Sequence, residues 1–377
     1  MRIGITTWHT GTNPGTFFQV FGLYKFLTDR GGEVKVIDYK QTEKSDLLPR
    51  GLHYYLSNFI GSLQVKFKRK KWPPIPEEFK AQREEQQKKY KRFYGQMEMT
   101  RQVSTDEDFK EVNSQFDCFI VGSDQIWNPN MLNRRYLLDY ADDTKIKASF
   151  GPSCGVSVFL PKQIENYAKY TSRFNYISTR ERVLADVLTK RLKREVEHVV
   201  DPSMLLSREY YDSIAQLPEG FEPNSYVLCY FMPKNESQRD QVRAYAKANN
   251  LKIVMLAALP YEFSFSDATI YAAAGPDEWL GLIKNAHTVF TSSFHCTIFS
   301  LLFHKNLFSY QQEPRSKTYD MNIRYVEIMK RYNAMHRFVL WGADLTPETM
   351  VPIDYDHYDS EFNAWREKSI KFLTQFV

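Results

Sequence analysis

Hydrophobic residues along the chain form alternating strand-like runs and helical periods. Strand-like runs cover residues 2–8 and 33–40, and an apolar-periodic helix runs from 17 to 27 between them. A strand, a glycine-bearing turn, a helix and a second strand make one βαβ unit, which predicts a parallel sheet. Four further strand-like runs cover 116–123, 145–153, 175–181 and 196–203.

A second series of the same kind follows the proline-rich stretch 213–225. Its strand-like runs cover 226–232, 251–257, 268–274, 288–294 and 307–312. We therefore expect an α/β protein with two facing Rossmann-like domains, over 1–210 and 222–350, and ligands between them near the carboxyl ends of the strands. This layout resembles the glycosyltransferase-B type of architecture. The amphipathic segment 358–377 predicts a last helix that packs back on the first domain.

A charged, helix-favouring region over about 42–110 interrupts the first series and predicts a helical insertion in the N-terminal domain. Within it, residues 59–72 combine aromatic and aliphatic residues with the basic run KFKRKK. Such a segment could make peripheral contact with an anionic membrane surface, and a solvated helical face is the alternative.

Composition narrows the class of protein. The 377 residues are 43% hydrophobic and 25% charged, which excludes wholesale disorder. A net charge of +5 is too small to indicate nucleic-acid binding, and we expect no nucleic-acid partner. Aromatic residues make up 15% of the chain, which suits core packing or carbohydrate recognition.

Several short motifs are missing from the sequence. It has no secretory signal pattern, no membrane-spanning apolar run and no CxxC pair among its four cysteines. We therefore expect a cytoplasmic protein, with peripheral contact at the inner face of the plasma membrane as the open alternative. Without HExxH, GxGxxG, GxxxxGK[ST] or a DxD-like pair, we expect no metal and no bound cofactor.

Two strand-to-helix turns carry the best candidates for chemistry. In FIVGSDQIWNP (119–129), Asp124 could accept a proton or hydrogen-bond a sugar hydroxyl, and Trp127 could stack on a sugar ring. A helix cap for Asp124 and a core position for Trp127 are equally open. In TSSFHC (291–296), Ser293 and the helix start suit an anion, and His295 suits a general acid or an anion contact. A structural histidine is the alternative.

Cationic residues follow two other strands. Arg180, in ISTRE (177–181), could clamp a carboxylate or phosphate, although the residues alone slightly favour an ion pair with a local acid such as Glu181. Past the last strand, Lys317, Asn322 and Arg324 could complete an anion site.

Together these segments resemble the polysaccharide pyruvyl transferase family. The similarity covers most of the chain and rests on NPGTFFQ (13–19), FDCFIVGSDQIWNP (116–129), SFG (149–151), ISTRE, DPSMLL (201–206), SFHC (293–296) and NIR (322–324). The resemblance implies a two-domain glycosyltransferase-B fold and transfer of the pyruvyl group of phosphoenolpyruvate, as co-substrate, to sugar hydroxyls of a bacterial surface polysaccharide or its precursor. A ketal forms and phosphate leaves. An oligosaccharide or a lipid-linked saccharide would be the acceptor.

The resemblance also implies roles for single residues. His295, Arg180 and Asp124 would be catalytic, and Arg180, Ser293, His295, Lys317, Asn322 and Arg324 would bind the donor. Asn13, Asp124 and Trp127 would lie on the acceptor side. The chain departs from several relatives in having Ser293 where they have Arg, and Cys296 where they have Gly. Two alternatives stay open: a nucleotide-sugar-dependent glycosyltransferase of the same fold, and an inactive carbohydrate-binding relative.

Overall fold

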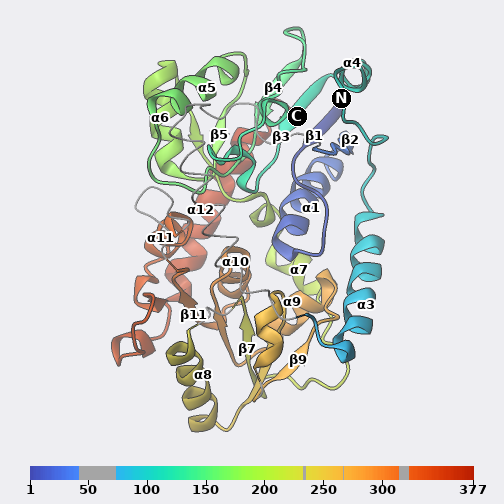
Figure 1. Ribbon diagram of the computed structural model, residues 1–377. Helices are drawn as coiled ribbons and strands as arrows, with labels where there is room; N and C mark the ends of the chain where they lie inside the picture. Colours follow the sequence, from blue (N-terminus) through green and yellow to red (C-terminus); the bar gives the residue numbers. More distant parts are fainter. Residues whose placement is uncertain (42–73, 232–234, 266, 314–321) are drawn as a thin grey trace, which may run out of the picture.

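The computed structural model describes residues 1–41, 74–231, 235–265, 267–313 and 322–377. Figure 1 shows two halves stacked one above the other, each built on a sheet with helices around it. The first sheet is parallel, in the order β2-β1-β3-β4. These strands are β1 (Arg2–Thr6), β2 (Glu33–Val36), β3 (Cys118–Val121) and β4 (Ile146–Ser149). All of β3 is buried, as expected for a strand covered on both faces.

The first sheet continues past β4 through short strands. The amide of Ser149 donates to the carbonyl oxygen of Tyr176 at 3.1 Å, and this bridge leads to the parallel pair β5 (Ser178–Thr179) and β6 (Glu197–His198). Helices α5 (Pro161–Thr171) and α6 (Arg182–Leu192) accompany these strands. The predicted runs at 175–181 and 196–203 are thus strands of only two residues each, because the chain turns inward directly after them.

The second sheet is also parallel, in the order β12-β11-β10-β7-β8-β9. Counted from β7, this is the strand order 3-2-1-4-5-6 of Rossmann domains, with the order reversing between β7 and β10. Its strands are β7 (Tyr226–Tyr230), β8 (Lys252–Leu256), β9 (Thr269–Tyr271), β10 (Thr288–Thr291), β11 (Asn306–Tyr310) and β12 (Phe338–Val339). Its helices are α8 (Glu236–Ala248), α9 (Pro276–Asn285), α10 (Phe294–Leu302) and α11 (Ile323–Arg331).

Helix α1 (Pro14–Thr28) joins the two halves through its buried aromatic residues. Phe18 packs against Trp279 and Phe299 of the second domain, with ring centroids 5.8 and 5.0 Å apart. One hydrophobic cluster therefore runs through both domains. Burial on nearly every face explains why α1 is apolar almost throughout.

Helix α3 (Glu77–Tyr94) is the first described helix of the predicted insertion. It packs along the second domain as well as the first, as Figure 1 shows beside α9 and β9. Lys89 pairs with Glu278 at 2.7 Å, and the Gln86 amide donates to the carbonyl oxygen of Ala274. Helix α4 (Asp106–Gln115) lies beyond it. The segment 59–72 lies outside the described residues.

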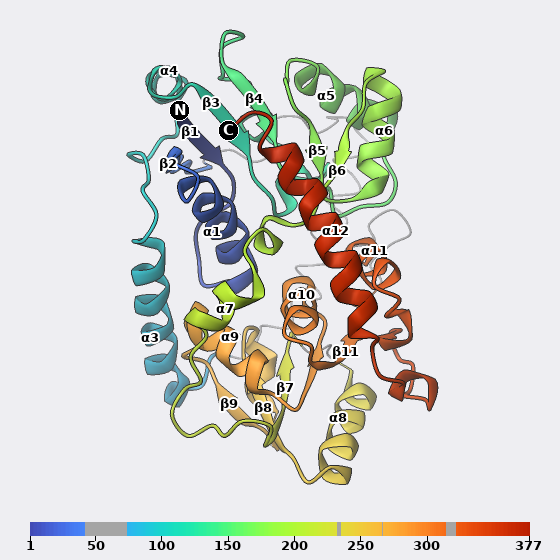
Figure 2. The ribbon, with the colours of Figure 1, turned by 180° about the vertical axis from the view of Figure 1, so that it is seen from behind.

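The last helix, α12 (Tyr355–Leu373), crosses the back of both domains (Figure 2). In the first domain, Arg366 donates to the carbonyl oxygens of Met204 and Leu205. At the other end, the Tyr355 hydroxyl donates to the carbonyl oxygen of Lys305 in the second domain. Short helix α7 (Arg208–Ile214) leads from one domain to the other. The exact domain limits stay a prediction. No helix in the described part of the chain is long and apolar enough to cross a membrane.

Candidate active site

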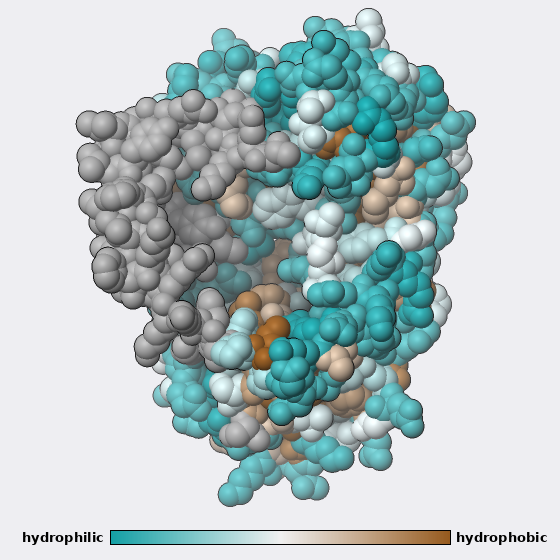
Figure 3. Space-filling view, turned by 45° about the vertical axis from the view of Figure 1, so that its right-hand side comes forward, coloured by the Kyte–Doolittle hydropathy of each residue, from teal (hydrophilic) through white to brown (hydrophobic). Residues whose placement is uncertain are grey.

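The points where the strand order reverses in the two sheets face each other across a hollow. In the first sheet the loops after β1 and β3 meet there, and in the second sheet the loops after β7 and β10 do. Figure 3 shows this hollow between the two halves, with hydrophobic residues on its lower rim. Open α/β sheets bind their ligands at such positions. The two turns singled out from the sequence therefore lie where a ligand is expected.

A buried carboxylate, that of Asp201, organises the floor of this region. It accepts hydrogen bonds from Arg180 Nη1 at 2.6 Å, Ser203 Oγ at 2.7 Å and Ser123 Oγ at 3.1 Å. His295 Nε2 lies 3.6 Å away. Burial alone would raise the pKa of Asp201, but the charges of His295 and Arg180 and these hydrogen bonds hold its pKa well below the usual range. Asp201 is therefore an anion that anchors two candidate catalytic groups.

The guanidinium of Arg180 is buried between two carboxylates. Besides Asp201, it pairs with Glu181 through Nε at 3.3 Å, and it stacks 4.4 Å over the ring of Phe294. Its Nη2 is buried without a hydrogen-bond partner, and so is Nε2 of His295. Buried N–H groups without acceptors are rare in proteins. Two of them beside the same carboxylate indicate a place for the oxygen atoms of a ligand.

His295 approaches the first domain from the first turn of α10. Its ring lies so close to Gly15, on the first turn of α1, that a Cβ at position 15 would be 2.1 Å from Nδ1. Each helix start has a side-chain cap, from Ser293 on α10 and from Asn13 on α1. The amino ends of two helices, both with positive dipole ends, thus meet at the cleft and favour anions there.

Asp124 lies at the edge of the same region, on the loop after β3. Its Oδ2 accepts from Thr16 Oγ1 and its Oδ1 from the amide of Gln125, both at 2.8 Å. It has a φ of 64°, a left-handed conformation that a non-glycine residue holds only where its surroundings require it. Asp124 caps a short helical turn and also accepts from Thr16 of α1, so the predicted cap is present, while its role as a proton acceptor or sugar contact stays a prediction.

Trp127 does not line the cleft, and its predicted stacking on a sugar is wrong. Its side chain is fully buried, its indole N–H donates to the carbonyl oxygen of Tyr136 at 2.7 Å, and it packs against Tyr167 and Phe174. The turn after Asp124 points this ring away from the loop and into the core. Trp8, two residues after the end of β1, is partly exposed and lines a cavity at the cleft instead.

A cavity of about 490 Å³ opens beside Trp8 at the carboxyl ends of β1 and β2. Thr16 lines it, and Thr16 donates to Asp124, so the cavity adjoins this carboxylate. The imidazole of His9 pairs with Asp38 at 3.0 Å, and both side chains line the wall. Aromatic faces and hydrogen-bonding groups together suit a sugar.

Comparison with known proteins places this geometry in a family. The model of the family described as "Polysaccharide pyruvyl transferase" matches residues 13–310, which include every described residue of the Asp201 site. The chain belongs to this family. None of the curated proteins matches the sequence.

Solved structures agree with the fold of this pyruvyl transferase family member. UDP-N-acetylglucosamine 2-epimerase from Rickettsia bellii has a TM-score of 0.52 at 9% identity, over 100% of this chain and 96% of that chain. UDP-GlcNAc 2-epimerase from Methanocaldococcus jannaschii has a TM-score of 0.49 at 11% identity, over the full length of both. The first likeness supports the two-domain, glycosyltransferase-B type α/β fold that the sequence predicted.

The remaining predicted donor residues of this family member lie at varying distances from the Asp201 site. Arg324 lies 5.5 Å from the Phe294 ring on which Arg180 also stacks. Asn322 instead fixes the backbone of Gln312, accepting from its amide at 2.9 Å. Lys317 lies outside the described residues.

Cys296, one of the two departures named from the sequence, is buried in the core cluster. Burial raises the pKa of its thiol to about 12. The extra bulk therefore fills the core behind α10 and does not enter the cleft. Among the described residues, no group of His, Cys, Asp and Glu side chains gathers as metal ligands would.

Three residues that the sequence interpretation missed contribute to the cleft: Trp8, Thr16 and Arg83. For Asp201 the sequence favours only a structural role at a strand-ending turn, whereas the structure places it at the centre of the site. Trp8 and Asp201 follow strand ends, so position alone could have indicated them. Arg83 gives no such signal, because it lies within the charged repeats of α3 and reaches the cleft only through the packing of that helix.

Proposed function

We propose that this protein transfers the pyruvyl group of phosphoenolpyruvate to sugar hydroxyls of a bacterial surface polysaccharide or its precursor. Membership in the pyruvyl transferase family supports the reaction class. The observation that supports the donor is the buried Nη2 of Arg180, which has no hydrogen-bond partner among the described residues, beside Nε2 of His295, whose only near acceptor there is the Asp201 carboxylate at 3.6 Å. Phosphoenolpyruvate is a small polyanion, and guanidinium, imidazolium and helix amino ends are its natural partners.

The proposed reaction begins with the enol carbon of the donor. A proton adds to the methylene carbon, which becomes a methyl group, and the neighbouring carbon becomes electrophilic. The oxygen of one sugar hydroxyl bonds to that carbon and gives up its proton. The bond to the phosphate oxygen then breaks, inorganic phosphate leaves with its electron pair, and a second hydroxyl closes the ketal. One hydroxyl proton balances the new methyl hydrogen and the other leaves on phosphate.

In this proposal the Asp201 site acts on the donor. His295, which lies beside the carboxylate of Asp201, supplies the proton to the methylene carbon. Arg180 Nη2 and the start of α10, with Ser293, hold the donor's anionic oxygens. Arg324 adds positive charge beyond Phe294, and Lys317 stays a predicted donor contact.

The acceptor lies on the side of the first domain in this proposal. Asp124 orients the attacking hydroxyl and receives its proton, with Thr16 fixing one carboxylate oxygen. Asn13 is exposed at the start of α1, and Trp8 replaces Trp127 as the ring against the sugar. An oligosaccharide or a lipid-linked saccharide would enter through the cavity beside Trp8.

The test is direct. Purified protein is incubated with phosphoenolpyruvate and a panel of oligosaccharide acceptors, while phosphate release and the mass of the acceptor are followed together. We expect equal amounts of phosphate and ketal, both lost in His295→Gln. Turnover of a nucleotide sugar with none of phosphoenolpyruvate would establish the glycosyltransferase alternative instead. Saccharide binding without turnover of either donor would establish the inactive relative.

A further inference from the structure

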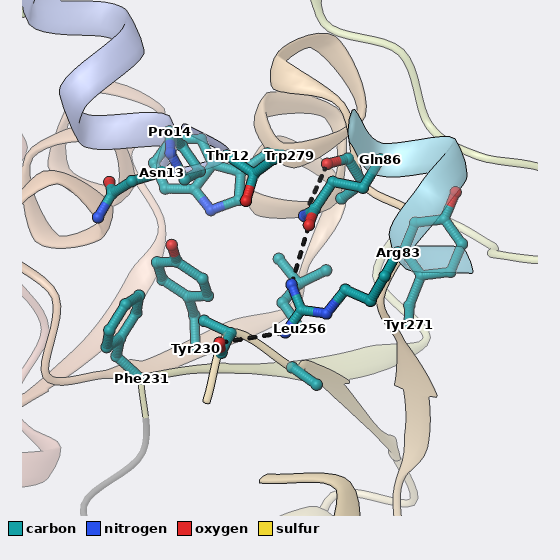
Figure 4. Close-up of a pocket in the computed structure, with 13 residues that line it drawn as sticks. Thr12, Asn13, Pro14, Arg83, Gln86, Tyr230, Phe231, Leu256, Tyr271 and Trp279 are labelled. Carbon is teal, nitrogen blue, oxygen red and sulfur yellow. Dashed lines mark hydrogen bonds between the residues drawn. The ribbon is translucent and has the colours of Figure 1, made fainter. Parts of the chain in front are cut away.

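A separate cavity of about 220 Å³ lies beyond the amino end of α1, at the carboxyl ends of β7 and β8. Asn13 and Pro14 of the first domain form one wall, and Trp279 of α9 lies close to them (Figure 4). Arg83 reaches in from α3 on the opposite side, toward Tyr230. Three segments far apart in sequence thus enclose the guanidinium group of Arg83.

Two N–H groups at this cavity are buried and have no acceptor: Nε of Arg83 and the indole Nε1 of Trp279. The other guanidinium nitrogens of Arg83 donate to neutral oxygens, Oε1 of Gln86 at 2.9 Å and the carbonyl of Ala258 at 3.1 Å. The charge of Arg83 is therefore not matched by a carboxylate hydrogen bond. Burying such a group without an acceptor costs free energy, which a bound anion would recover.

Acidic side chains do not supply the missing acceptor for these N–H groups. None of the described residues that line the cavity is acidic. Burial lowers the pKa of Arg83, and the carboxylate of Glu262 only partly opposes this. One oxygen of Glu262 already accepts from the amides of Ala258 and Leu259, each at 2.7 Å. The cavity is thus rich in donors and open to an anion.

We propose that this cavity binds a phosphate group of the acceptor saccharide, an inference that rests on the proposed function. The donor cluster lies at β10, α10 and α11, whereas the Arg83 cavity lies at β7 and β8 and is lined by neither His295 nor Arg180. Two free N–H groups from different directions, one of them on a guanidinium, suit a tetrahedral anion with several oxygens. The aromatic rings of Tyr230 and Trp279 give the adjoining sugar an apolar surface.

Shared lining residues connect this cavity, through a neighbouring one, to the cavity beside the proposed base. The Arg83 cavity shares Thr12 with a neighbouring cavity, and that cavity shares His9 and Asp38 with the one beside Trp8. The last of these contains Thr16, which contacts Asp124. An extended saccharide could therefore hold its phosphate at Arg83 while a distal sugar presents its hydroxyls to Asp124.

The test measures binding without turnover, by calorimetry with a hexose 1-phosphate and the matching neutral hexose. We expect the phosphorylated sugar to bind more tightly and Arg83→Gln to weaken it about tenfold or more. Trp279→Phe removes the indole N–H, together with part of the ring, and should weaken it several-fold. Lys88→Gln, which removes a positive charge from the exposed face of the same helix, should change nothing. Equal binding by Arg83→Gln and the wild type would overturn the proposal.

Two further measurements show whether the bound phosphate belongs to the acceptor or to the donor, and whether the phosphate site and the proposed function fail together. If hexose 1-phosphate still binds at saturating phosphoenolpyruvate, the cavity belongs to the acceptor. If the two ligands compete, and Arg83→Gln loses affinity for both equally, the cavity belongs to the donor and the proposal is overturned. If Arg83→Gln unfolds, Arg83→Lys keeps the charge, removes Nε and is compared instead. Arg83-dependent binding by a protein that is inactive towards phosphoenolpyruvate would refute the proposed function and still support the phosphate site.

Discussion

The imidazole of His295 lies directly against the backbone of Gly15, although one belongs to the second domain and the other to the first. A Cβ at position 15 would be 2.1 Å from Nδ1 and 2.6 Å from Cγ of the ring. Only a residue without a side chain permits this approach. The position of the candidate acid is therefore set by the packing of two helix starts across the cleft.

Gly15→Ala should displace His295 and reduce turnover. A shift of about 1 Å in a catalytic group can cost about 100-fold in rate, and we expect a loss of that order in kcat/KM. Steady-state phosphate release measures it. Gly95→Ala is the matched control, because Gly95 ends α3 with an ordinary helical φ of −65°. Unchanged turnover in Gly15→Ala would show that the approach has no catalytic importance.

Asp201→Asn should destabilise the protein as well as reduce activity. The substitution removes the negative charge that pairs with buried Arg180, and breaking such a pair typically costs about 3–5 kcal/mol. Because the folded pKa of Asp201 lies below its unfolded value, its contribution is complete above about pH 4 and is lost only on further acidification. Urea unfolding of both proteins should give a constant difference from pH 5 to 8. A difference that shrinks within this range would contradict the assignment.

Substitution by alanine should mainly weaken acceptor binding at Trp8 and mainly lower the free energy of unfolding at Trp127. Trp127→Ala leaves a cavity in the core and should lower the free energy of unfolding by about 3–5 kcal/mol. Trp8→Ala removes a partly exposed ring from the proposed acceptor cavity and should raise the acceptor KM about tenfold with a smaller loss of stability. Chemical unfolding and acceptor titration separate the two effects. An unchanged acceptor KM in Trp8→Ala would exclude the ring from acceptor binding.

Glu327 lies where the two domains meet, and its titration makes the free energy of unfolding depend on pH. On α11, it accepts from the backbone amide of Arg182 at the start of α6. Burial, followed by the negative charge of Glu181, raises the pKa of Glu327 to about 7. The folded state therefore holds its proton more tightly, and stability is lost as the pH rises from about 4.5 to 7.

Glu327→Gln should remove this loss. Relative to the wild type, the variant should gain about 3 kcal/mol in the free energy of unfolding between pH 4 and 8. Denaturant unfolding across that range measures the gain, and the exposed Glu165→Gln is the control. His198, whose pKa burial lowers to about 4, lies 3.7 Å from Glu327 and acts in the opposite direction, so the two proteins are also compared in a His198→Asn background. Parallel pH profiles would refute the assignment.

The strand-to-helix turns were predictable because they depend on local pattern. Apolar runs that end in Ser123-Asp124 and Ser292-Ser293 predict strand ends, and parallel strands bring such ends to one edge. The direction of a side chain after such a turn is not local. Trp127 follows Asp124 by three residues, yet the left-handed conformation at Asp124 and the packing against Tyr167 send it into the core.

The sequence by itself determined two α/β domains, the family and the residues Arg180 and His295, since periodicity and short motifs carry these. Only the tertiary structure decided that Asp201 holds both residues, that Gly15 receives the histidine ring, and that Arg83 crosses from α3 to the second domain. The physical reason is that each of these contacts joins residues at least 21 positions apart in the chain. Such pairings follow from how the two sheets and α3 pack together, which no local pattern specifies.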